Sequence, residues 1–550
     1  MKYKILIVAI TLAFYACDSS NSEKGKNKSS GNTEESNKKV TKRNYYINKQ
    51  NSYSEFFFDS SELVKYITSN SLNDSLSRRM ISFYNNRNYQ YAWFTGTGPT
   101  EQARGFWNMY EYYLSSEPNK VVADKAMMET MDRFIASDDT SWTGKEKDLL
   151  STELKMTDHF IRFYLSNIDK GYIKRKEMEK FVPYVKSDAI QLADSLLQKK
   201  HKDDKYYEDV NKTYGALKDY LGKYMAVQKG GGWPIVNATA KQLNVKTASP
   251  LVSLLKKRLY LSGDLAISDT TTMWNDTLAS AIKNFQVRHG YTPTGQLTEQ
   301  QLKDMNVPVD IRIQQLLINM GRTQWVIDQP KGKFIVVNIP EFIFHLTERG
   351  QKVFDMPVVV GKEGHNTMMF TGNLNQIVFS PYWNVPYSIV QKEILPAVDK
   401  DPNYLAKNNM EINGTLGNGI PAVRQLPGEK NSLGKVKFLF PNSFDIYFHD
   451  TPAKSLFEKD KRAYSHGCIR LSEPTKLAEY LLKDSPEWTP EKINAAMNAG
   501  EEKYVKLKEP VPVLISYYTA WVDENGFLHF AEDIYGHDKL QAGKIFTNAF

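Results

Sequence analysis

The hydrophobic positions in the first half of the chain recur at helical spacing. Residues 145–167 carry a dense apolar stripe, and the Gly-Gly-Gly-Trp-Pro run at 230–234 ends the helical pattern. We expect residues 51–249 to form a helical domain whose aromatic residues are mostly core, with a carbohydrate or peptide groove as the alternative. The clearest stripe, with steps of three or four, consists of Tyr207, Val210, Tyr214, Leu217, Leu221 and Tyr224.

Residues 250–306 predict a small unit of three short helices. Two apolar stripes precede a turn at 289–295, and a third short helix follows over 298–305. One more apolar stripe leads to Trp325, so that residues 307–332 are expected to form a linking helix. The stripes consist of Leu251, Leu254, Leu255 and Leu259; Leu278, Ile282 and Phe285; and Ile313, Leu316, Leu317 and Met320.

Beyond residue 332 the pattern changes to runs of β-branched and aromatic residues. Strands are predicted at 334–338, 341–348, 352–360, 376–380, 437–440, 444–449 and 513–518. Gly350 lies between two of them, as in a hairpin turn. We expect residues 333–550 to form a mostly-β domain. Residues 388–434 are rich in Asn, Gly and Pro around one helical piece, which is typical of a long insertion that caps a site.

Composition and charge narrow the class of protein. The 550 residues suffice for three or four domains of roughly 100–200 residues each. Hydrophobic residues make up 41% and charged residues 24%, which excludes wholesale disorder. The net charge of +8 lies mostly in the first 50 residues, and only +2 remains on residues 51–550. A nucleic-acid partner is therefore not indicated. The two cysteines exclude a disulfide-stapled fold and a Cys-rich zinc module.

The N-terminus predicts export. Lys2 and Lys4 precede an apolar run at 5–16 that is too short to span a bilayer, so residues 1–17 are interpreted as a signal peptide. Ala16 before Cys17 resembles a bacterial lipoprotein cleavage site, which makes Cys17 the predicted lipidation site. Residues 18–50 are rich in Ser, Asn and Lys and predict a disordered tether. An ordinary cleaved signal peptide is the alternative.

One stretch near the end of the β-rich half carries the chemistry. His449 closes a predicted strand, and Cys468 follows 19 residues later, directly after Gly467. A nucleophilic cysteine needs a base or cation nearby, and histidine is the natural base. Gly467 leaves space beside the sulfur for a carbonyl substrate. Backbone N–H groups of a tight turn can form an oxyanion hole, and Arg470 is placed to bind a carboxylate.

Two other cysteine chemistries fit the pattern less well. His449, His466 and Cys468 could ligate zinc, but a fourth ligand and the usual zinc-ligand spacings are missing. Papain-like peptidases have the cysteine before the histidine in the chain, which is the reverse of the order here. No nucleotide-binding glycine motif stands at a strand–helix junction, so we expect neither a metal nor another cofactor.

These motifs resemble those of the L,D-transpeptidase catalytic domain family (the YkuD type). Residues 447–452 (Tyr-Phe-His-Asp-Thr-Pro) and 464–471 (Tyr-Ser-His-Gly-Cys-Ile-Arg-Leu) fill every position of its signature. Residues 336–340, 357–361 and 381–386 look like its large multi-domain members, apart from Thr367-Met368 where Thr-Pro is usual. Residues 250–306 resemble the peptidoglycan-binding domain type 1 family, with Thr294 where Asp is frequent. A helical spacer is the alternative for this unit.

The resemblance implies an α+β multi-domain fold and a role for each site residue. The fold would join a helical scaffold, a three-helix peptidoglycan-binding module and a mostly-β catalytic domain with a capping insertion. Cys468 would be the nucleophile and His449 the general base, oriented by the backbone carbonyl of Asp450. The remaining roles are an oxyanion site from Tyr447 and the amides of Gly467 and Cys468, substrate contacts from Ser465, His466 and Arg470, and a cleft wall at Trp383.

The implied function is an L,D-transpeptidase of the bacterial cell envelope. It would form 3→3 cross-links between peptidoglycan stem peptides through a cysteine thioester, with peptidoglycan as partner and a lipid anchor in the membrane. Acylation of Cys468 by carbapenems is a corollary. The alternative is a lipid-anchored peptidoglycan-binding tether with an inactive catalytic domain.

Overall fold

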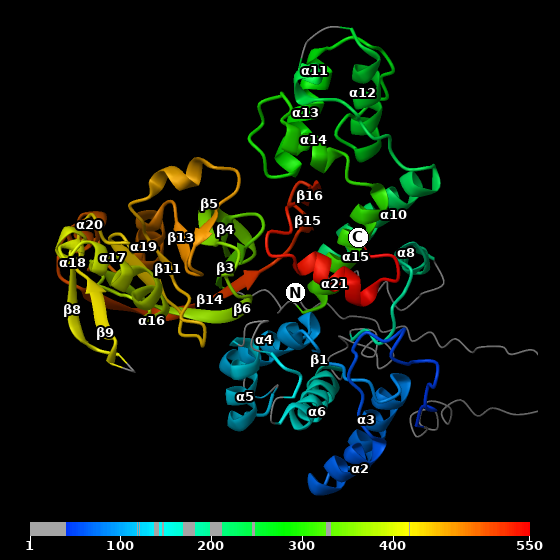
Figure 1. The fold of residues 1–550 in the computed structure, drawn as a ribbon, viewed down its shortest axis with the longest axis horizontal. Helices are drawn as coiled ribbons and strands as arrows, with labels where there is room; N and C mark the ends of the chain where they lie inside the picture. The colour runs from blue at the N-terminus through cyan, green and yellow to red at the C-terminus, as the bar shows by residue number, and fades with distance from the viewer. Residues whose placement is uncertain are drawn as a thin grey trace, which may run out of the picture.

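The computed structural model describes residues 40–117, 119, 121–136, 142–145, 148–168, 182–198, 212–244, 248–325, 332–416 and 419–549. The predicted signal peptide with Cys17, residues 18–39 of the predicted tether, and Tyr207 and Val210 of the first stripe lie outside these ranges. Figure 1 shows a small helical unit at the top, a group of helices at the bottom and a β-rich part on the left. None of the helices in the described ranges is both long and apolar enough to cross a membrane.

The scaffold helices enclose an aromatic core. They are α2 (Ser60–Ser69), α3 (Asp74–Asn86), α4 (Glu101–Ser116), α5 (Lys125–Ala136) and α6 (Leu149–Ile168), with a short hairpin of β1 (Phe94–Thr95) and β2 (Gly98–Pro99). Asp59, Asn73 and Thr100 cap α2, α3 and α4 by accepting hydrogen bonds from backbone N–H groups. Trp93 and Trp107 are buried in this core, as expected for most aromatic residues of the helical domain.

The end of the predicted tether belongs to this folded part. Ile47 is buried, and the Asn44 N–H donates to the carbonyl of Asn85 at 2.8 Å. The Asn85 side chain in turn donates to the carbonyl of Thr41 at 2.7 Å. The prediction of a disordered tether up to residue 50 therefore extends too far. A stretch that is polar overall still orders here because one apolar side chain and the backbone find partners on α3.

A second helical group joins the scaffold to the C-terminus. It contains α8 (Ala189–Leu197), α10 (Lys212–Lys229), α15 (Val309–Arg322), the 3-10 turn η3 (Thr323–Trp325), and α21 (His537–Ile545) with the hairpin of β15 (Ala520–Val522) and β16 (Leu528–Phe530). Arg322 is the polar centre of the junction, since its guanidinium lies 2.6 Å from carboxylate oxygens of both Glu101 and Asp538. Residues 520–549, predicted as part of the catalytic domain, thus pack on the linking helix.

The three predicted helices of the small unit are present, preceded by α11 (Ala240–Asn244). They are α12 (Pro250–Ser262), α13 (Asp276–Arg288) and α14 (Glu299–Met305), and their apolar stripes form one buried cluster. Thr298 and Gln301 form a capping box at the start of α14. The turn before it contacts the β-rich part, because the Thr292 hydroxyl donates to Asp460 at 2.9 Å.

The β-rich part is a mixed sheet of nine strands. Their order is β12-β5-β13-β11-β10-β6-β14-β3-β4, and β4 also pairs with β5, so the sheet closes on itself. The strands are β3 (Lys333–Asn338), β4 (Ile343–Glu348), β5 (Gln351–Gly361), β6 (Phe370–Phe379), β10 (Val436–Leu439), β11 (Phe448–His449), β12 (Ala463–Ser465), β13 (Ile469–Leu471) and β14 (Lys503–Ser516). The 3-10 turn η6 (Lys454–Glu458) and helices α19 (Pro474–Leu482) and α20 (Pro490–Met497) complete this part.

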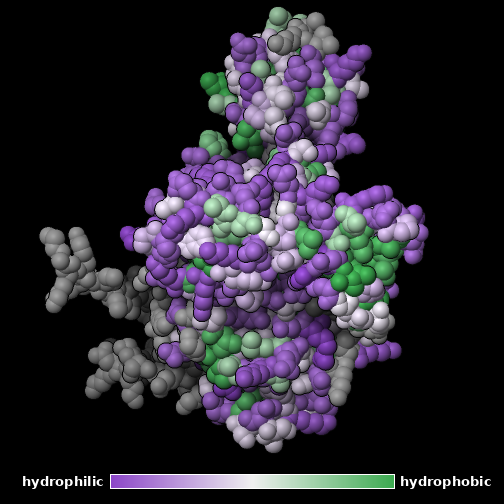
Figure 2. Space-filling model, turned by 90° about the vertical axis from the view of Figure 1, so that its left-hand side faces the viewer, coloured by the Kyte–Doolittle hydropathy of each residue, from purple (hydrophilic) through white to green (hydrophobic). Residues whose placement is uncertain are grey.

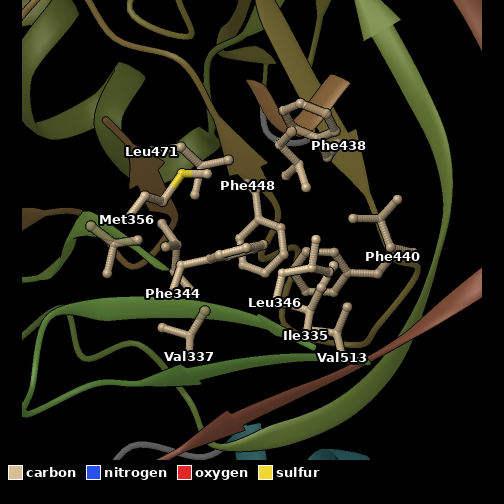
Figure 3. Close-up of a cluster of buried hydrophobic side chains, with 14 of the residues drawn as sticks. Ile335, Val337, Phe344, Leu346, Met356, Phe438, Phe440, Phe448, Leu471 and Val513 are labelled. Carbon is tan, nitrogen blue, oxygen red and sulfur yellow. The ribbon is translucent and has the colours of Figure 1, made fainter. Parts of the chain in front are cut away.

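The centre of this domain is a closely packed apolar cluster. Side chains from β3, β4, β5, β10, β11, β13 and β14 meet there, as Figure 3 shows for Phe344, Phe440 and Phe448. The Phe440 and Phe448 ring centroids are 4.6 Å apart. The cluster confirms the mostly-β core that the sequence predicts. Strand lengths differ: β6 and β14 begin earlier than predicted, and β11 is only two residues long.

The predicted capping insertion is a small subdomain rather than a long loop. It contains β7 (Trp383–Asn384), α16 (Tyr387–Ile389), the π-helix η4 (Val390–Ile394), α17 (Leu395–Lys400), α18 (Tyr404–Lys407), β8 (Met410–Thr415) and β9 (Pro421–Gln425). A core of its own includes Val390, Ile394 and Val423, and it lies at the left of Figure 1. Figure 2 shows the molecule from this side, where hydrophilic residues cover most of the surface and hydrophobic ones gather in separate patches.

The C-terminal end of the capping subdomain, which is called the lid below, is held by the Asp450 carboxylate. One carboxylate oxygen of Asp450 accepts the Lys435 N–H at 2.9 Å, and the other lies 2.7 Å from the Lys454 ammonium. Gly434 precedes Lys435 with a φ of +59°, and a Cβ atom there would lie 2.3 Å from an Asp450 carboxylate oxygen. Position 434 therefore requires glycine for both its backbone conformation and the space that Asp450 fills.

We predict that Gly434→Ala destabilises the protein more than the control substitution Gly419→Ala. Gly419 lies in the same lid at a φ of +75°, and a Cβ atom added there would have no neighbour within 4 Å. The control should therefore cost only the left-handed backbone penalty of about 1–2 kcal/mol. Gly434→Ala should cost about 1–3 kcal/mol more, because the methyl group displaces Asp450. Thermal and urea unfolding of both variants measure the difference, and equal losses would contradict the packing argument.

Candidate active site

The parallel pairing of β11 with β13 brings the two halves of the motif together. Phe448 pairs with Ile469 and His449 with Arg470, in one unbroken register. Phe448 and Ile469 both point into the apolar core of the sheet. Because side chains alternate between the two faces of a strand, the residues on either side of this pair point away from the core. His449 and Arg470 thus share one face. Tyr447 and Cys468 directly precede the two strands, and the Tyr447 ring centroid lies 5.8 Å from that of His449.

His449 is buried and held in one orientation. Its Nδ1 lies 2.5 Å from the Asp450 carbonyl oxygen, the contact that the family resemblance implies. A carbonyl can only accept, so Nδ1 carries the proton and Nε2 keeps its lone pair. Burial, and secondarily the charge of Arg470, lower the pKa of His449 to about 3. The imidazole is therefore neutral at neutral pH and able to take a proton.

The Cys468 thiol is also neutral at rest. Its Sγ lies 3.6 Å from the Asp445 carbonyl oxygen. Burial raises the pKa of Cys468 to about 11, although hydrogen bonds with Tyr447 and the charge of Arg470 act in the opposite direction. The sequence predicts a neighbouring base or cation that holds Cys468 as a thiolate. In the structure, desolvation penalises the charged forms of both groups, so the thiol and the imidazole are neutral.

The turn before Cys468 is held by Ser465. The Ser465 hydroxyl donates to the Cys468 carbonyl at 2.5 Å and accepts the Gly467 N–H at 3.1 Å. The Gly467 amide is already bonded, so the Cys468 amide is the free backbone donor of the predicted oxyanion pair among the described residues. Ser465 is buried and bonded within the turn, in keeping with its predicted role of shaping the site.

Gly467 is required for its backbone conformation. Its φ is +115°, a conformation that side chains rarely adopt, while a Cβ atom there would meet nothing closer than 3.9 Å. Its carbonyl accepts a hydrogen bond from the hydroxyl of Thr367 at 2.7 Å. In the sequence, Thr367 stands out only as part of the Thr-Met pair where the family usually has Thr-Pro. The one sequence signal for a role of Thr367 is that it closely follows residues 357–361, which resemble the large multi-domain members of the family.

Arg470 lies beside both reacting groups. Burial lowers its own pKa, and its charge lowers the pKa of His449 and of Cys468. Its Nε is buried without a hydrogen-bond partner, and among the residues that the structure describes no carboxylate forms an ion pair with it. Such a group is suited to an incoming carboxylate or carbonyl oxygen, as the sequence predicts.

The lid reaches the motif through His466. The imidazole Nε2 of His466 lies 2.9 Å from a carboxylate oxygen of Glu393 in η4, and the His365 ring packs edge-on at a centroid distance of 4.8 Å. Glu393 lies in the π-helical turn η4, and Pro396 follows in the first turn of α17. Trp383 is half-buried in the lid sheet, paired with Gln425, and belongs to the cap itself.

A separate cavity of about 480 Å³ lies between the scaffold, α15 and β14. Its walls include Asn108, Trp325, Met369 and Tyr518, and none of the predicted site residues lines it. Within the described ranges, no group of three or more His, Cys, Asp or Glu side chains is arranged to hold a metal ion.

Comparisons with known proteins point to the same region. Residues 332–495 match the family model of the L,D-transpeptidase catalytic domain, residues 78–221 that of a scaffold domain, and residues 248–305 that of a "Putative peptidoglycan binding domain". A curated relative from Haemophilus influenzae, a "Putative L,D-transpeptidase", is 33% identical over 241 residues, which cover 41% of this chain and 48% of the relative. The chain thus spans about half the length of that relative.

Solved structures show more distant likeness. An L,D-transpeptidase from Stackebrandtia nassauensis is 15% identical, with 49% of this chain and 91% of that chain covered and a TM-score of 0.22. One from Mycobacterium smegmatis is also 15% identical, with 34% and 58% covered and a TM-score of 0.19. The sequence matches show that residues 332–495 resemble an L,D-transpeptidase catalytic domain and that residues 248–305 resemble a peptidoglycan binding domain.

Proposed function

We propose that this protein is an L,D-transpeptidase that forms 3→3 cross-links between peptidoglycan stem peptides. The observation that carries the proposal is the parallel pairing of β11, which contains His449, with β13, which directly follows Cys468, together with the bond between Nδ1 of the imidazole and the Asp450 carbonyl. The match of residues 332–495 to the L,D-transpeptidase catalytic domain supports the same reaction class.

The first half-reaction is acylation. The Cys468 sulfur attacks the carbonyl carbon at the L-centre of the third stem residue, and the thiol proton moves to Nε2 of His449. The Cys468 N–H and the Tyr447 hydroxyl stabilise the oxyanion, and Arg470 binds a polar group of the stem. When the C–N bond breaks, the imidazolium returns its proton to the leaving amine. The terminal D-residue departs and a thioester remains on Cys468.

The second half-reaction transfers the acyl group. An amine of a neighbouring stem attacks the thioester carbonyl, His449 accepts a proton from that amine, and the thiolate leaves and is reprotonated. A new amide bond is formed with the energy of the cleaved one, so the reaction requires no nucleotide. We further propose that the protein acts in the cell envelope, anchored through a lipid on Cys17, with the unit at 250–306 holding glycan.

Turnover of tetrapeptide muropeptides tests this function. The wild-type protein should release the terminal D-residue and form dimers, both detectable by mass spectrometry. Cys468→Ala should abolish both, and a carbapenem should add its mass to the wild type but not to Cys468→Ala. A wild-type protein that is retained on sacculi but shows neither release nor adduct would instead be the inactive tether.

We predict a large effect at His449 and none at a matched histidine. His449→Ala removes the general base and should slow acylation about 10²–10⁴-fold. His529→Ala is the control, because His529 pairs with Asp523 in the β15–β16 hairpin and contacts no site residue. Initial rates of D-residue release compare the two variants. A comparable loss in both would point to a general folding defect.

The neutral thiol–imidazole pair predicts the pH dependence of alkylation. Because the pKa of Cys468 is about 11, its thiolate fraction should rise about tenfold per pH unit between pH 7 and 10. The rate of alkylation by iodoacetamide should follow this rise without a plateau. Arg470→Gln should lower the rate at each pH, since the Arg470 charge lowers the thiol pKa. A plateau between pH 5 and 8 would reveal a thiolate–imidazolium pair and contradict this assignment.

A further inference from the structure

The peptide group between Gly467 and Cys468 is held in place by a hydrogen bond to its carbonyl oxygen. The Thr367 hydroxyl donates to the Gly467 carbonyl at 2.7 Å and accepts the Gly361 N–H at 2.9 Å. A trans peptide is planar, so its N–H points opposite to its C=O. The bond from Thr367 thus turns the Cys468 N–H away from Thr367. Among the described residues, no hydrogen-bond acceptor is found for this N–H.

This hydrogen bond is important for the orientation of the peptide group because residue 467 is a glycine. Gly467 has a φ of +115°, and glycine populates both positive and negative φ readily. Its flanking peptide can therefore rotate at little backbone cost unless another group holds it. Ser465 holds the carbonyl of Cys468 on the far side, whereas Thr367 holds the plane that contains the Cys468 N–H.

Thr367 is itself held by Tyr535. The Tyr535 hydroxyl accepts the Thr367 N–H at 3.2 Å and donates to the Gly361 carbonyl at 2.7 Å. It thereby ties together the two backbone segments that position the Thr367 hydroxyl. Tyr535 lies in the C-terminal segment, outside the residues 332–495 that match the catalytic family model.

Tyr535 is anchored in turn from the junction with the scaffold. Its N–H donates to the Tyr517 hydroxyl at 3.0 Å, and that hydroxyl donates to the Asp533 carboxylate at 2.7 Å. The same segment continues to Asp538, which pairs with Arg322 of the linking helix. A continuous set of buried and half-buried contacts thus runs from the junction to the turn before Cys468.

We infer that Thr367 and Tyr535 are positioning residues that aim the Cys468 N–H at the oxyanion of the acyl-transfer step. This inference rests on the proposed function, but it concerns a different quantity: the stabilisation of charge on a carbonyl oxygen, not the supply of the thiolate. Neither side chain contacts the reacting atoms. Loss of a complete oxyanion donor costs about 10²–10³ in rate, so loosening one should cost about tenfold.

Two reactions of the Cys468 thiol distinguish stabilisation of the oxyanion from supply of the thiolate. Acylation by p-nitrophenyl acetate passes through an oxyanion, whereas alkylation by iodoacetamide does not. Tyr535→Phe and Thr367→Val should each lower the ratio of the acylation rate to the alkylation rate about tenfold. Both should leave the pH profile of alkylation unchanged, and Thr367→Ser should restore the ratio because it retains the hydroxyl. The double variant Thr367→Val/Tyr535→Phe should lower this ratio little more than either single variant, since both residues act through one peptide group.

Tyr480→Phe is the matched control. Its hydroxyl donates to Glu348 at 2.5 Å in the same domain, away from the turn, so both rates should equal those of the wild type. An unchanged ratio in Tyr535→Phe and Thr367→Val would overturn the inference, as would equal losses of both reactions. The inference would also be overturned if the wild-type ratio of acylation rate to alkylation rate were no higher than that of free N-acetylcysteine. D-residue release from muropeptides is measured beside these assays, and its absence with an intact ratio effect would sink the proposed function alone.

Discussion

The parallel pairing of β11 with β13 in a single register is the constraint on which the candidate site depends. It sets His449 beside Arg470 and turns Phe448 and Ile469 into the core. A shift by one residue would bury the polar set and expose the apolar one, so core packing itself enforces the juxtaposition. The same closeness to the core desolvates the imidazole and the thiol. The pairing therefore determines both where the reacting groups lie and that they rest uncharged.

Residues that are close in the sequence could be predicted, because short-range patterns carry their signal. The motif around His449 and Cys468 is local and could be recognised, although the strand at 469–471 that follows it is not among the predicted ones. Thr367 and Tyr535 could not be found in this way. Their hydrogen bonds join segments about 100 and 170 positions apart, and no local pattern encodes such a contact. The bond between Ser465 and the Gly467 N–H is local, yet it depends on a turn conformation that spacing alone does not specify.

The lid and the strand ends were less predictable for a physical reason. β8 is largely exposed, with Ile412 among its accessible residues, so it lacks the alternation that marks a half-buried strand. The predicted strand at 444–449 is mostly a turn, because the Asn442 side chain accepts the N–H groups of Phe444 and Ile446. A polar side chain competing for backbone groups can thus outweigh β-propensity over a few residues.

The two ends of the lid lie side by side. The chain leaves the sheet at Ser380 and returns at Lys435, and the Ser380 N–H donates to the Lys435 carbonyl at 2.9 Å, next to the paired Phe379 and Val436. An ordinary tight turn could span the same gap. The number of residues between these ends can therefore vary without disturbing the sheet, since lengthening a closed loop adds little entropy cost. Insertions or deletions within the cap would change its length while β6 and β10 keep their pairing.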